Sequence, residues 1–466
     1  MGGLFGVVST NSDCVKDLFY GTDYHSHLGT RRGGLAVKNS GGFQRFIKDI
    51  TTSQFRAKFD RDISKMHGDK GIGVISDSDD QPLIINSNLG VFALVTVGKI
   101  NNLEQLAKKA LTNGSHFSEM HGGEISPTEM VATLISQCSS FEMGIRRVHE
   151  KIDGSCTIVL LTNDGLYAAR DKLGRTPLIL GKKEGSYAIT METCAFPNLG
   201  YEIEKYLGPG EVLYITKEGA KQVIPPGDRL QICAFLWVYY GYPASSYEGV
   251  NVEAVRYRCG AQLAKSDYVD VDLIAGIPDS GIGHGLGYAN ETQLPFLRPF
   301  VKYTPTWPRS FMPQDQNVRD RVAKMKLIPI KELIENKRLL FCEDSIVRGT
   351  QLRKTIERLF DSGAKEVHMR PACPPLIYAC KFLNFSQSRS ELDLAGRWAI
   401  KELLGKNIED PSGYFDPNSE NYKAMVDVIR KKLHLTSLKY QTLEDLVKAI
   451  GLPKEKLCTY CWDGAS

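Results

Sequence analysis

The stretch LLFCEDSIVRGTQLRKTIERL, residues 339–359, decides the fold of the second half of the chain. An apolar run ends in two adjacent acids, Glu343 and Asp344, and a loop then leads from Ser345 to Thr350 into a helical pattern. Backbone N–H groups at the start of a helix attract anions, and α/β folds bind ligands beyond the carboxyl edge of the sheet. A phosphate cradle beside two acids that can bind a diol suits a phosphorylated sugar. A solvated acidic turn is the alternative interpretation.

Strands and helices alternate around this stretch. The segments YVDVDLIAGI (268–277), RLLFC (338–342) and EVHMR (366–370) have the composition of buried strands, and apolar residues recur at helical spacing over 350–360. This alternation predicts a parallel α/β sheet. The tail from about residue 390 reads as mostly helical.

The first half of the chain has a different rhythm. Alternating apolar residues flank Gly-, Asn- and Asp-containing turns in GVFALVTVG (90–98), CTIVLLTNDGLYAARD (156–171) and GEVLYITKEG (210–219), a pattern typical of hairpins. Helical stretches lie around 103–112 and 127–147. These patterns predict a layered α+β domain built on antiparallel sheets.

The chain is expected to divide at the Pro- and Gly-marked segment VIPPGDRLQ, residues 223–231. At 466 residues it is long enough for two or three domains of about 150 residues each. We therefore expect one domain over 1–225 and a second over 226–466.

The composition excludes several classes of protein. A net charge of +4 is too small to indicate nucleic acid or an anionic membrane as the main partner. No apolar run approaches the roughly 20 residues of a membrane span. The start MGGLFGVVST lacks the features of a secretory signal and of a myristoylation site. The expected location is the cytoplasm, where the eleven cysteines stay reduced.

Residues 339–359 closely resemble the 5-phosphoribosyl-1-pyrophosphate (PRPP) motif of type I phosphoribosyltransferases, in the form found in glutamine PRPP amidotransferases, the first committed enzymes of purine synthesis. The resemblance implies a four-layer α+β domain like the N-terminal-nucleophile hydrolases, followed by an α/β type I phosphoribosyltransferase domain with a helical tail. Further segments match this family in the same order along the chain: 166–181, 191–196, 208–215, 275–296 and 308–329.

The resemblance also implies how the sugar phosphate would be held. Glu343 and Asp344 would bind the ribose hydroxyls, where the family usually has two aspartates. The extra methylene of Glu343 could shift the ribose slightly. The 5′-phosphate would lie in a cradle formed by Ser345, Arg348, Gly349 and Thr350.

Pyrophosphate and its magnesium ion would lie near Asp279 and Ser280, and Lys302, Arg309 and Lys326 would neutralise the leaving group. Displacement of pyrophosphate builds oxocarbenium character and a highly charged leaving group. Electrostatic stabilisation and exclusion of water should therefore outweigh any protein nucleophile. By resemblance the catalytic residues are Arg309, Lys326, Glu343 and Asp344.

Four cysteines fall where the iron–sulfur members of this family have cluster ligands: Cys233, Cys380, Cys458 and Cys461. Four thiolates are the usual complement of a 4Fe–4S cluster, whose role here would be structural. The alternatives are a zinc ion in the same cage or four reduced, buried cysteines. Cys373 is the one credible substitute ligand.

The glutamine-hydrolysing site of the family is incomplete in this sequence. Aligning Gly3 to Gly6 on the family's N-terminal run places Gly2 where a cysteine nucleophile belongs. The strand that should carry an arginine for the glutamine carboxylate reads GIGVISDSDDQP (71–82), and the asparagine of the oxyanion hole is replaced by Val97. Since loss of one oxyanion donor costs about 100- to 1000-fold in rate, we predict that glutamine hydrolysis is lost.

The leading hypothesis is an enzyme that transfers 5-phosphoribosyl from PRPP to ammonia, giving 5-phosphoribosylamine and pyrophosphate. Its ammonia could come from solution or from a partner glutaminase, and another amine could take its place. The alternative is a non-catalytic regulatory paralogue that binds PRPP or a nucleotide. The replacement of the family's Arg-Pro-Asp-Ser by Tyr242-Pro243-Ala244-Ser245 and of its Gly-Arg by Pro308-Arg309 favours this second hypothesis. The resemblance implies a homodimer or homotetramer.

Overall fold

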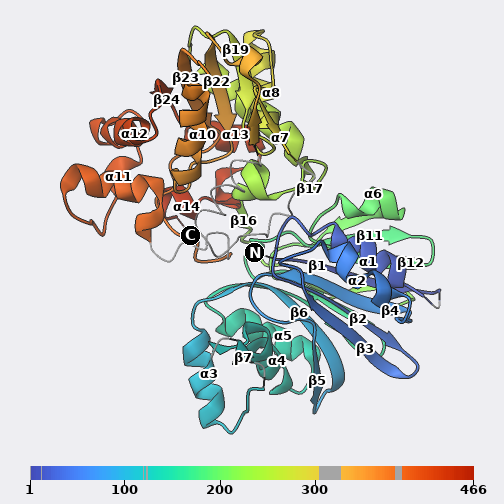
Figure 1. The fold of residues 1–466 in the computed structure, drawn as a ribbon. Coiled ribbons are helices and arrows are strands. Elements are labelled where there is room, and N and C mark those ends of the chain that lie inside the picture. The colour runs from blue at the N-terminus through green and yellow to red at the C-terminus, as the bar shows by residue number, and fades with distance from the viewer. Residues whose placement is uncertain are drawn as a thin grey trace.

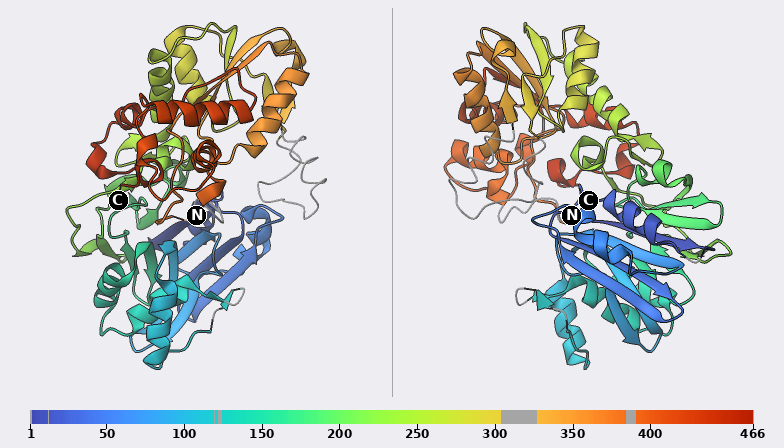
Figure 2. Two further views of the ribbon diagram at one scale, coloured as in Figure 1. Left: turned by 90° about the vertical axis from the view of Figure 1, so that its left-hand side faces the viewer. Right: turned by 45° about the vertical axis from the view of Figure 1, so that its right-hand side comes forward.

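The structure of the protein is a computed structural model that describes residues 2–11, 13–118, 120–121, 124–303, 327–383 and 391–465. Figure 1 shows two layered parts, the N-terminal one in blue to green and the C-terminal one in yellow to red. Figure 2 shows the same separation from two further directions. The N and C labels both lie where the two parts meet.

Two antiparallel sheets form the centre of the N-terminal part. The first has, in spatial order, β13 (Glu202–Tyr206), β11 (Ile179–Lys183), β12 (Ser186–Thr190), β1 (Gly2–Ser9), β4 (Lys70–Ser76), β2 (Arg32–Asn39) and β3 (Gly42–Asp49). The second has β15 (Ala220–Ile224), β14 (Val212–Ile215), β10 (Leu166–Ala169), β9 (Gly154–Leu161), β6 (Gly90–Ile100) and β5 (Leu83–Ser87).

Helices cover the outer faces of both sheets. The first sheet packs against α1 (Val15–Asp23), α2 (Phe55–Ile63) and α6 (Ala195–Leu199). The second packs against α3 (Leu103–Thr112), α4 (Pro127–Ser136) and α5 (Phe141–Lys151), beside the small hairpin of β7 (Met120–His121) and β8 (Glu124–Ile125). These four layers explain why β9 is almost continuously apolar. Its Val159 and Leu161 enter the core between the sheets, while Ile158 and Leu160 face the helices.

A four-stranded parallel sheet forms the centre of the C-terminal part, in the order β19 (Leu273–Gly276), β22 (Arg338–Glu343), β23 (Glu366–Pro371) and β24 (Ser437–Leu438). One face packs against α7 (Val252–Lys265), α8 (Ile282–Thr292) and α13 (Leu443–Ile450). The other packs against α10 (Thr350–Asp361), α11 (Ala395–Leu404) and α12 (Glu420–Lys432). The predicted parallel α/β sheet and helical tail are confirmed.

Short elements complete the C-terminal part. A turn of π-helix covers Leu236–Tyr240, and 3-10 turns cover Lys331–Leu333, Glu391–Asp393, Ser412–Tyr414 and Lys454–Lys456. The remaining elements are β16 (Ile232–Cys233), β17 (Ser246–Tyr247), β18 (Val250–Asn251), β20 (Phe300–Lys302), β21 (Leu327–Pro329), β25 (Leu457–Cys458) and α14 (Tyr460–Asp463). β16 pairs with β25 in parallel and so joins the start of this part to the end of the chain.

Two predicted elements differ in extent. The strand expected over 268–277 covers only Leu273–Gly276, and Asp270 and Asp272, which precede it, form ion pairs with the guanidinium of Arg338. The helix expected over 127–147 is two helices, α4 and α5. Ser140 starts the second one by accepting a hydrogen bond from the backbone N–H of Met143.

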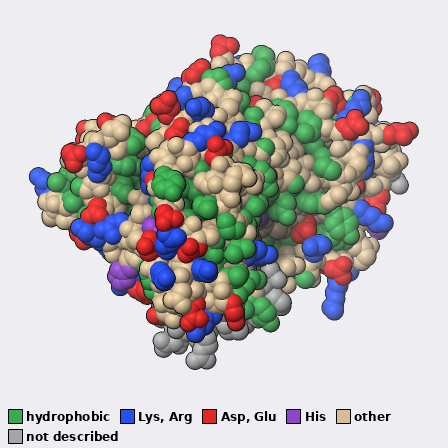
Figure 3. All heavy atoms as spheres, turned by 90° about the horizontal axis from the view of Figure 1, so that it is seen from above, with side chains coloured by type: hydrophobic (Ala, Val, Ile, Leu, Met, Phe, Trp, Pro, Cys, Tyr) green, Lys and Arg blue, Asp and Glu red, His purple; other side chains and the backbone are tan. Residues whose placement is uncertain are grey.

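Two further features are the distribution of charged side chains on the surface and the length and apolar character of the helices. Figure 3, which views the molecule from above, shows acidic and basic side chains interspersed over the visible face. Within the residues that the structure describes, no helix is long and apolar enough to span a bilayer.

Candidate functional site

The acid pair lies at the carboxyl end of β22, the second strand of the parallel sheet. Glu343 and Asp344 are 8% and 6% exposed. The hydroxyl of Ser280 donates to Glu343 Oε1 at 3.2 Å, and the backbone N–H of Asp344 donates to the same oxygen at 3.0 Å. Ser345 Oγ donates to Asp344 Oδ1 at 2.5 Å. The strand, the following loop and the loop after β19 thus hold both carboxyls at one place.

Burial and like charge perturb this pair. Burial, together with the adjacent Asp344 carboxyl, raises the pKa of Glu343 well above its usual value. Arg256 on α7 is also buried, which lowers its pKa, while the charges of Glu253 and Asp344 oppose that shift. A site that crowds two carboxyls in this way favours ligands that bring hydrogen-bond donors or positive charge.

The loop from Ser345 to Gly349 leads directly into α10. Gly349 is the N-cap residue of that helix and has φ +80°, a left-handed conformation that favours glycine. Arg348 is exposed, and its Nη2 lies 3.5 Å from Asp393 Oδ2. The first turn of α10, which begins at Thr350, therefore opens beside the acid pair, as an anion cradle requires.

The loop after β19 forms the other wall of the site. Its Ile277 N–H donates to the carbonyl of Cys342 at 3.0 Å, which fixes the loop to β22. A Cβ at Gly281 would lie 2.3 Å from the same carbonyl oxygen, so only glycine allows this approach. Asp279 is exposed and forms an ion pair with Lys302 of β20.

The structure thus brings together nine of the eleven predicted substrate-site residues at one edge of the sheet or beside it. Arg309 and Lys326 lie outside the described residues. The nine are Asp279, Ser280, Lys302, Glu343, Asp344, Ser345, Arg348, Gly349 and Thr350. Arg256 of α7, which the sequence prediction did not include, interacts electrostatically with Asp344.

The four predicted cluster cysteines also converge. Cys233 and Cys458 are cross-strand partners in the β16–β25 pair. A hydrogen bond from Cys461, aided by the backbone N–H groups of Phe382 and Leu383, lowers the pKa of Cys380 to about 6. Cys461 in turn interacts electrostatically with Cys233 and Cys458. Among the described side chains, no group of three or more His, Cys, Asp or Glu is arranged to hold a metal ion.

A buried arginine accompanies these thiols. Arg175 Nη1 donates to Cys458 Sγ at 2.7 Å, and its guanidinium carbon lies 3.2 Å from the centre of the Phe382 ring. Its Nη2 donates to Gln231 Oε1 at 3.2 Å. The sequence prediction missed this residue, although it lies in the matched segment 166–181.

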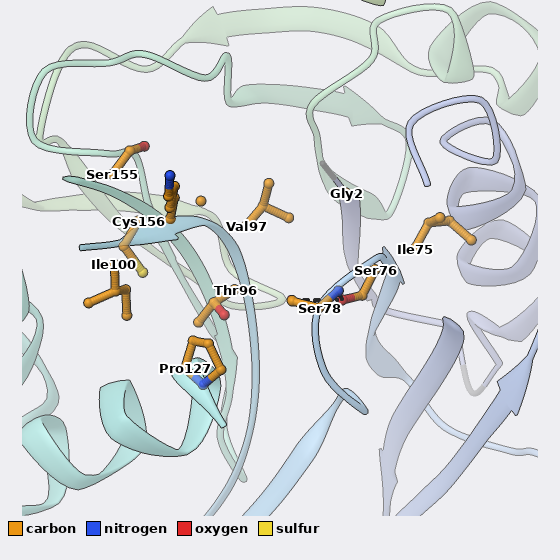
Figure 4. A pocket seen from close by; sticks show the side chains of 12 residues that line it. Gly2, Ile75, Ser76, Ser78, Thr96, Val97, Ile100, Pro127, Ser155 and Cys156 are labelled. Atoms are coloured by element: carbon orange, nitrogen blue, oxygen red, sulfur yellow. Dashed lines mark hydrogen bonds between the residues drawn. The ribbon is translucent and has the colours of Figure 1, made fainter. Parts of the chain in front are cut away.

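A cavity of 210 Å³ lies at the start of β1. Figure 4 shows Ile75, Ser76 and Ser78 on the side of Gly2, and Thr96, Ile100, Pro127, Ser155 and Cys156 on the other side. Gly2 pairs with Ser76 across the β1–β4 ladder. A Cβ at Gly2 would lie 2.5 Å from the carbonyl oxygen of Ile75, closer than side chains approach a backbone atom.

A buried carboxylate joins the two parts of the chain, and the sequence prediction missed it as well. Glu192 accepts hydrogen bonds from Tyr247 Oη at 2.8 Å and from Ser245 Oγ, and lies 3.1 Å from His27 Nε2. Burial alone would raise the pKa of Glu192, but His27 and Ser245 bring it below its usual value. The sequence did contain a signal for this network, since Glu192 lies in the matched METCAF segment and Ser245 in the altered Tyr-Pro-Ala-Ser segment.

Comparison with known proteins decides the family. A family model described as a glutamine amidotransferase domain matches residues 69–197. An amidophosphoribosyltransferase of Archaeoglobus fulgidus is 30% identical over 418 residues, covering 86% of this chain and 89% of that protein. The chain belongs to the amidophosphoribosyltransferase family. Another amidophosphoribosyltransferase, from Methanocaldococcus jannaschii, is 29% identical over 491 residues, covering 100% of this chain and 97% of that protein.

A solved structure extends the similarity to the whole fold. The glutamine PRPP amidotransferase of B. subtilis, solved with ADP and GMP, superposes with a TM-score of 0.85 and 26% identity over 99% of this chain and 96% of that one. The fold is therefore an N-terminal-nucleophile-hydrolase-like glutaminase domain plus a phosphoribosyltransferase domain. As a member of the amidophosphoribosyltransferase family, the chain is an enzyme of the phosphoribosyltransferase class, within the glycosyltransferases.

Proposed function

We propose that this amidophosphoribosyltransferase transfers 5-phosphoribosyl from PRPP to ammonia or another amine, as in purine biosynthesis, and has lost glutamine hydrolysis. The observation that carries the transferase half is the cluster of buried acids, loop hydroxyls and helix start at the carboxyl edge of the parallel sheet. Ammonia would reach it from solution or from a partner glutaminase.

Each group in this cluster has a task in that reaction. Glu343 and Asp344 would accept hydrogen bonds from the two ribose hydroxyls, and the loop from Ser345 to Thr350 would receive the 5′-phosphate. Magnesium, held near Asp279, would supply positive charge to the pyrophosphate. Lys302 forms an ion pair with Asp279, which supports a contact of its ammonium with the same group. Arg309 and Lys326 remain proposed contacts of the leaving group.

Loss of glutamine hydrolysis is supported by the cavity at Gly2. A cysteine there would have to displace the Ile75 carbonyl from its position 2.5 Å away. Val97 offers no hydrogen bond in place of an oxyanion donor. The thiol that lines the cavity, Cys156, is buried, which raises its pKa, and a protonated thiol is a poor nucleophile.

A 4Fe–4S cluster is the metal centre that the cysteines support best. The hydrogen bond from Cys461 lowers the pKa of Cys380 and favours a thiolate there. Burial raises the pKa of Cys233 and Cys458, and the hydrogen bond to Cys380 raises that of Cys461, so binding of the cluster would have to deprotonate these three thiols. Cys233, Cys380, Cys458 and Cys461 would hold the cluster, which would then tie β16 to the segment around β25.

The experiment is pyrophosphate release by the purified chain with PRPP and Mg²⁺, comparing ammonium with glutamine. We expect turnover with ammonium and none with glutamine. Turnover driven by glutamine would overturn the proposed loss of hydrolysis. PRPP binding without turnover for any amine would instead support the regulatory alternative. Light scattering on the same sample tests the homodimer or homotetramer that the resemblance implies.

A further inference from the structure

The cavity beside Gly2 is a polar, cationic site that the proposed reaction does not use. Among its described lining residues, Lys99 is the one charged side chain, and hydroxyls come from Ser76, Ser78, Thr96 and Ser155. No carboxylate belongs to that lining. The nearby buried acid, Asp79, already accepts hydrogen bonds from Ser78, Gln81, Ser126 and the backbone of Thr128.

One hydroxyl of the cavity is left without a partner. Ser155 is 1% exposed, and its Oγ has no hydrogen-bond partner among the residues that the structure describes. An unsatisfied buried hydroxyl destabilises the folded chain, and a ligand atom that forms a hydrogen bond with it would remove that cost. Ser155 is also the cross-strand partner of Lys99 in the β6–β9 pair, so the two side chains are neighbours on one face of the sheet.

The remaining lining selects the ligand's carbon skeleton. Ile75, Val97, Ile100 and Pro127 give the cavity apolar walls beside its polar groups. The cavity volume of 210 Å³ is far above the ~10–15 Å³ that a single water needs. The cavity therefore has room for a small organic acid. An α-amino group would find no carboxylate in the described lining to pair with, which disfavours glutamine and other amino acids.

We propose that this cavity binds a small 2-oxo or 2-hydroxy carboxylic acid, with the carboxylate on Lys99 and the oxygen at carbon 2 near Ser155. This inference rests on the proposed loss of glutamine hydrolysis, because it gives the former glutamine cavity another ligand. Lys99 Nζ also donates to the carbonyl of Cys380 at 3.3 Å. Its ammonium has three donors, so it can hold the acid and keep this contact with the C-terminal part.

The test is isothermal titration calorimetry of the full chain, without PRPP, using 2-oxobutyrate and 2-hydroxybutyrate as probes and L-glutamine and inorganic phosphate for comparison. We expect the acids to bind more tightly than either comparison ligand. Lys99→Gln should weaken binding by about tenfold to a hundredfold, since it removes a charge-assisted hydrogen bond. Lys99→Arg should retain most of the affinity. Ser155→Ala should weaken binding by about threefold to tenfold.

The matched control is Lys108→Gln, which removes an exposed lysine on α3 and should leave binding unchanged. Absence of heat for both acids at millimolar concentration would overturn the inference, and so would binding that Lys99→Gln leaves intact. Tighter binding of phosphate would make the cavity a simple anion site and would also overturn it. If neither acid binds and glutamine supports no turnover, this inference fails while the proposed function stands. Turnover driven by glutamine would overturn the proposed function by itself.

Discussion

Asp344 is the residue on which the proposed transfer depends most directly. It is buried at the edge of the sheet and accepts a hydrogen bond from Ser345. Asp344→Asn should lower kcat/KM for PRPP by about tenfold to a hundredfold, because a hydrogen bond to a charged group contributes about 1.5–3 kcal/mol. Steady-state pyrophosphate release measures this. The control Asp361→Asn, at the exposed end of α10, should change kcat/KM for PRPP little. An equal loss of kcat/KM in both variants would contradict the role assigned to Asp344.

Glu343 gives a prediction for pH. Burial and Asp344 raise the pKa of Glu343 in the folded chain. Protonated Glu343 therefore contributes its full stability below the ordinary glutamate pKa, and this contribution is lost as pH rises through the raised pKa. Glu343→Gln, which cannot ionise, should therefore raise the melting temperature relative to the wild type, by an amount that grows from pH 5 to pH 8. Thermal unfolding without ligands at several pH values checks this. A difference that is constant with pH would contradict it.

At the scale of elements, the turn into α10 should matter for phosphate binding as well as for stability. Gly349→Ala places a side chain at φ +80°, which costs about 1–2 kcal/mol, and it should also raise KM for PRPP severalfold by moving the cradle. Gly405→Ala is the matched control, since Gly405 ends α11 at φ +70° and a Cβ added there would meet no atom within 4 Å. It should lose similar stability with no change in KM. A shift in KM for both variants would show that the effect is general.

The β16–β25 pair gives a prediction about metal content. Anaerobically purified protein should be brown and contain iron and sulfide in the ratio of a 4Fe–4S cluster. Cys380→Ser should lose most of the iron, whereas Cys138→Ser, on the distant second-sheet side of the N-terminal part, should retain it. Iron analysis and absorption spectroscopy of the wild type and both variants test this prediction. Zinc in place of iron, or equal iron in both variants, would contradict the assignment.

Sequence patterns predicted these elements to differing degrees. The parallel sheet and the α10 turn followed from a run of apolar residues and a glycine, which are local signals. The strand predicted over 268–277 is longer than the observed one. The ion pairs of Asp270 and Asp272 with Arg338 involve a neighbouring strand, which a local sequence pattern does not reveal. The resemblance supplied the roles of the site residues, but it did not supply Arg256 or Arg175. Their importance comes from burial beside Asp344 and Cys458, which only the folded chain shows.

At the scale of the whole molecule, Glu192 links the two parts. Tyr247→Phe removes one donor to this buried carboxylate and should destabilise the protein by about 1–3 kcal/mol. The measurement is denaturant unfolding followed by circular dichroism. Tyr268→Phe removes the same hydroxyl from a side chain that is 91% exposed and should change stability little. Equal effects of the two variants would contradict a structural role for the Glu192 network.

The close approach of Ile75 to Gly2 also bears on how this protein can evolve. With the Ile75 carbonyl oxygen 2.5 Å from the position of a Cβ, a single codon change to cysteine would not by itself rebuild a reactive side chain. The edge of β4 would have to move at the same time, and an oxyanion donor would have to return near Val97. Under the proposed function, the present backbone of β4 therefore opposes the recovery of glutamine hydrolysis by a single substitution.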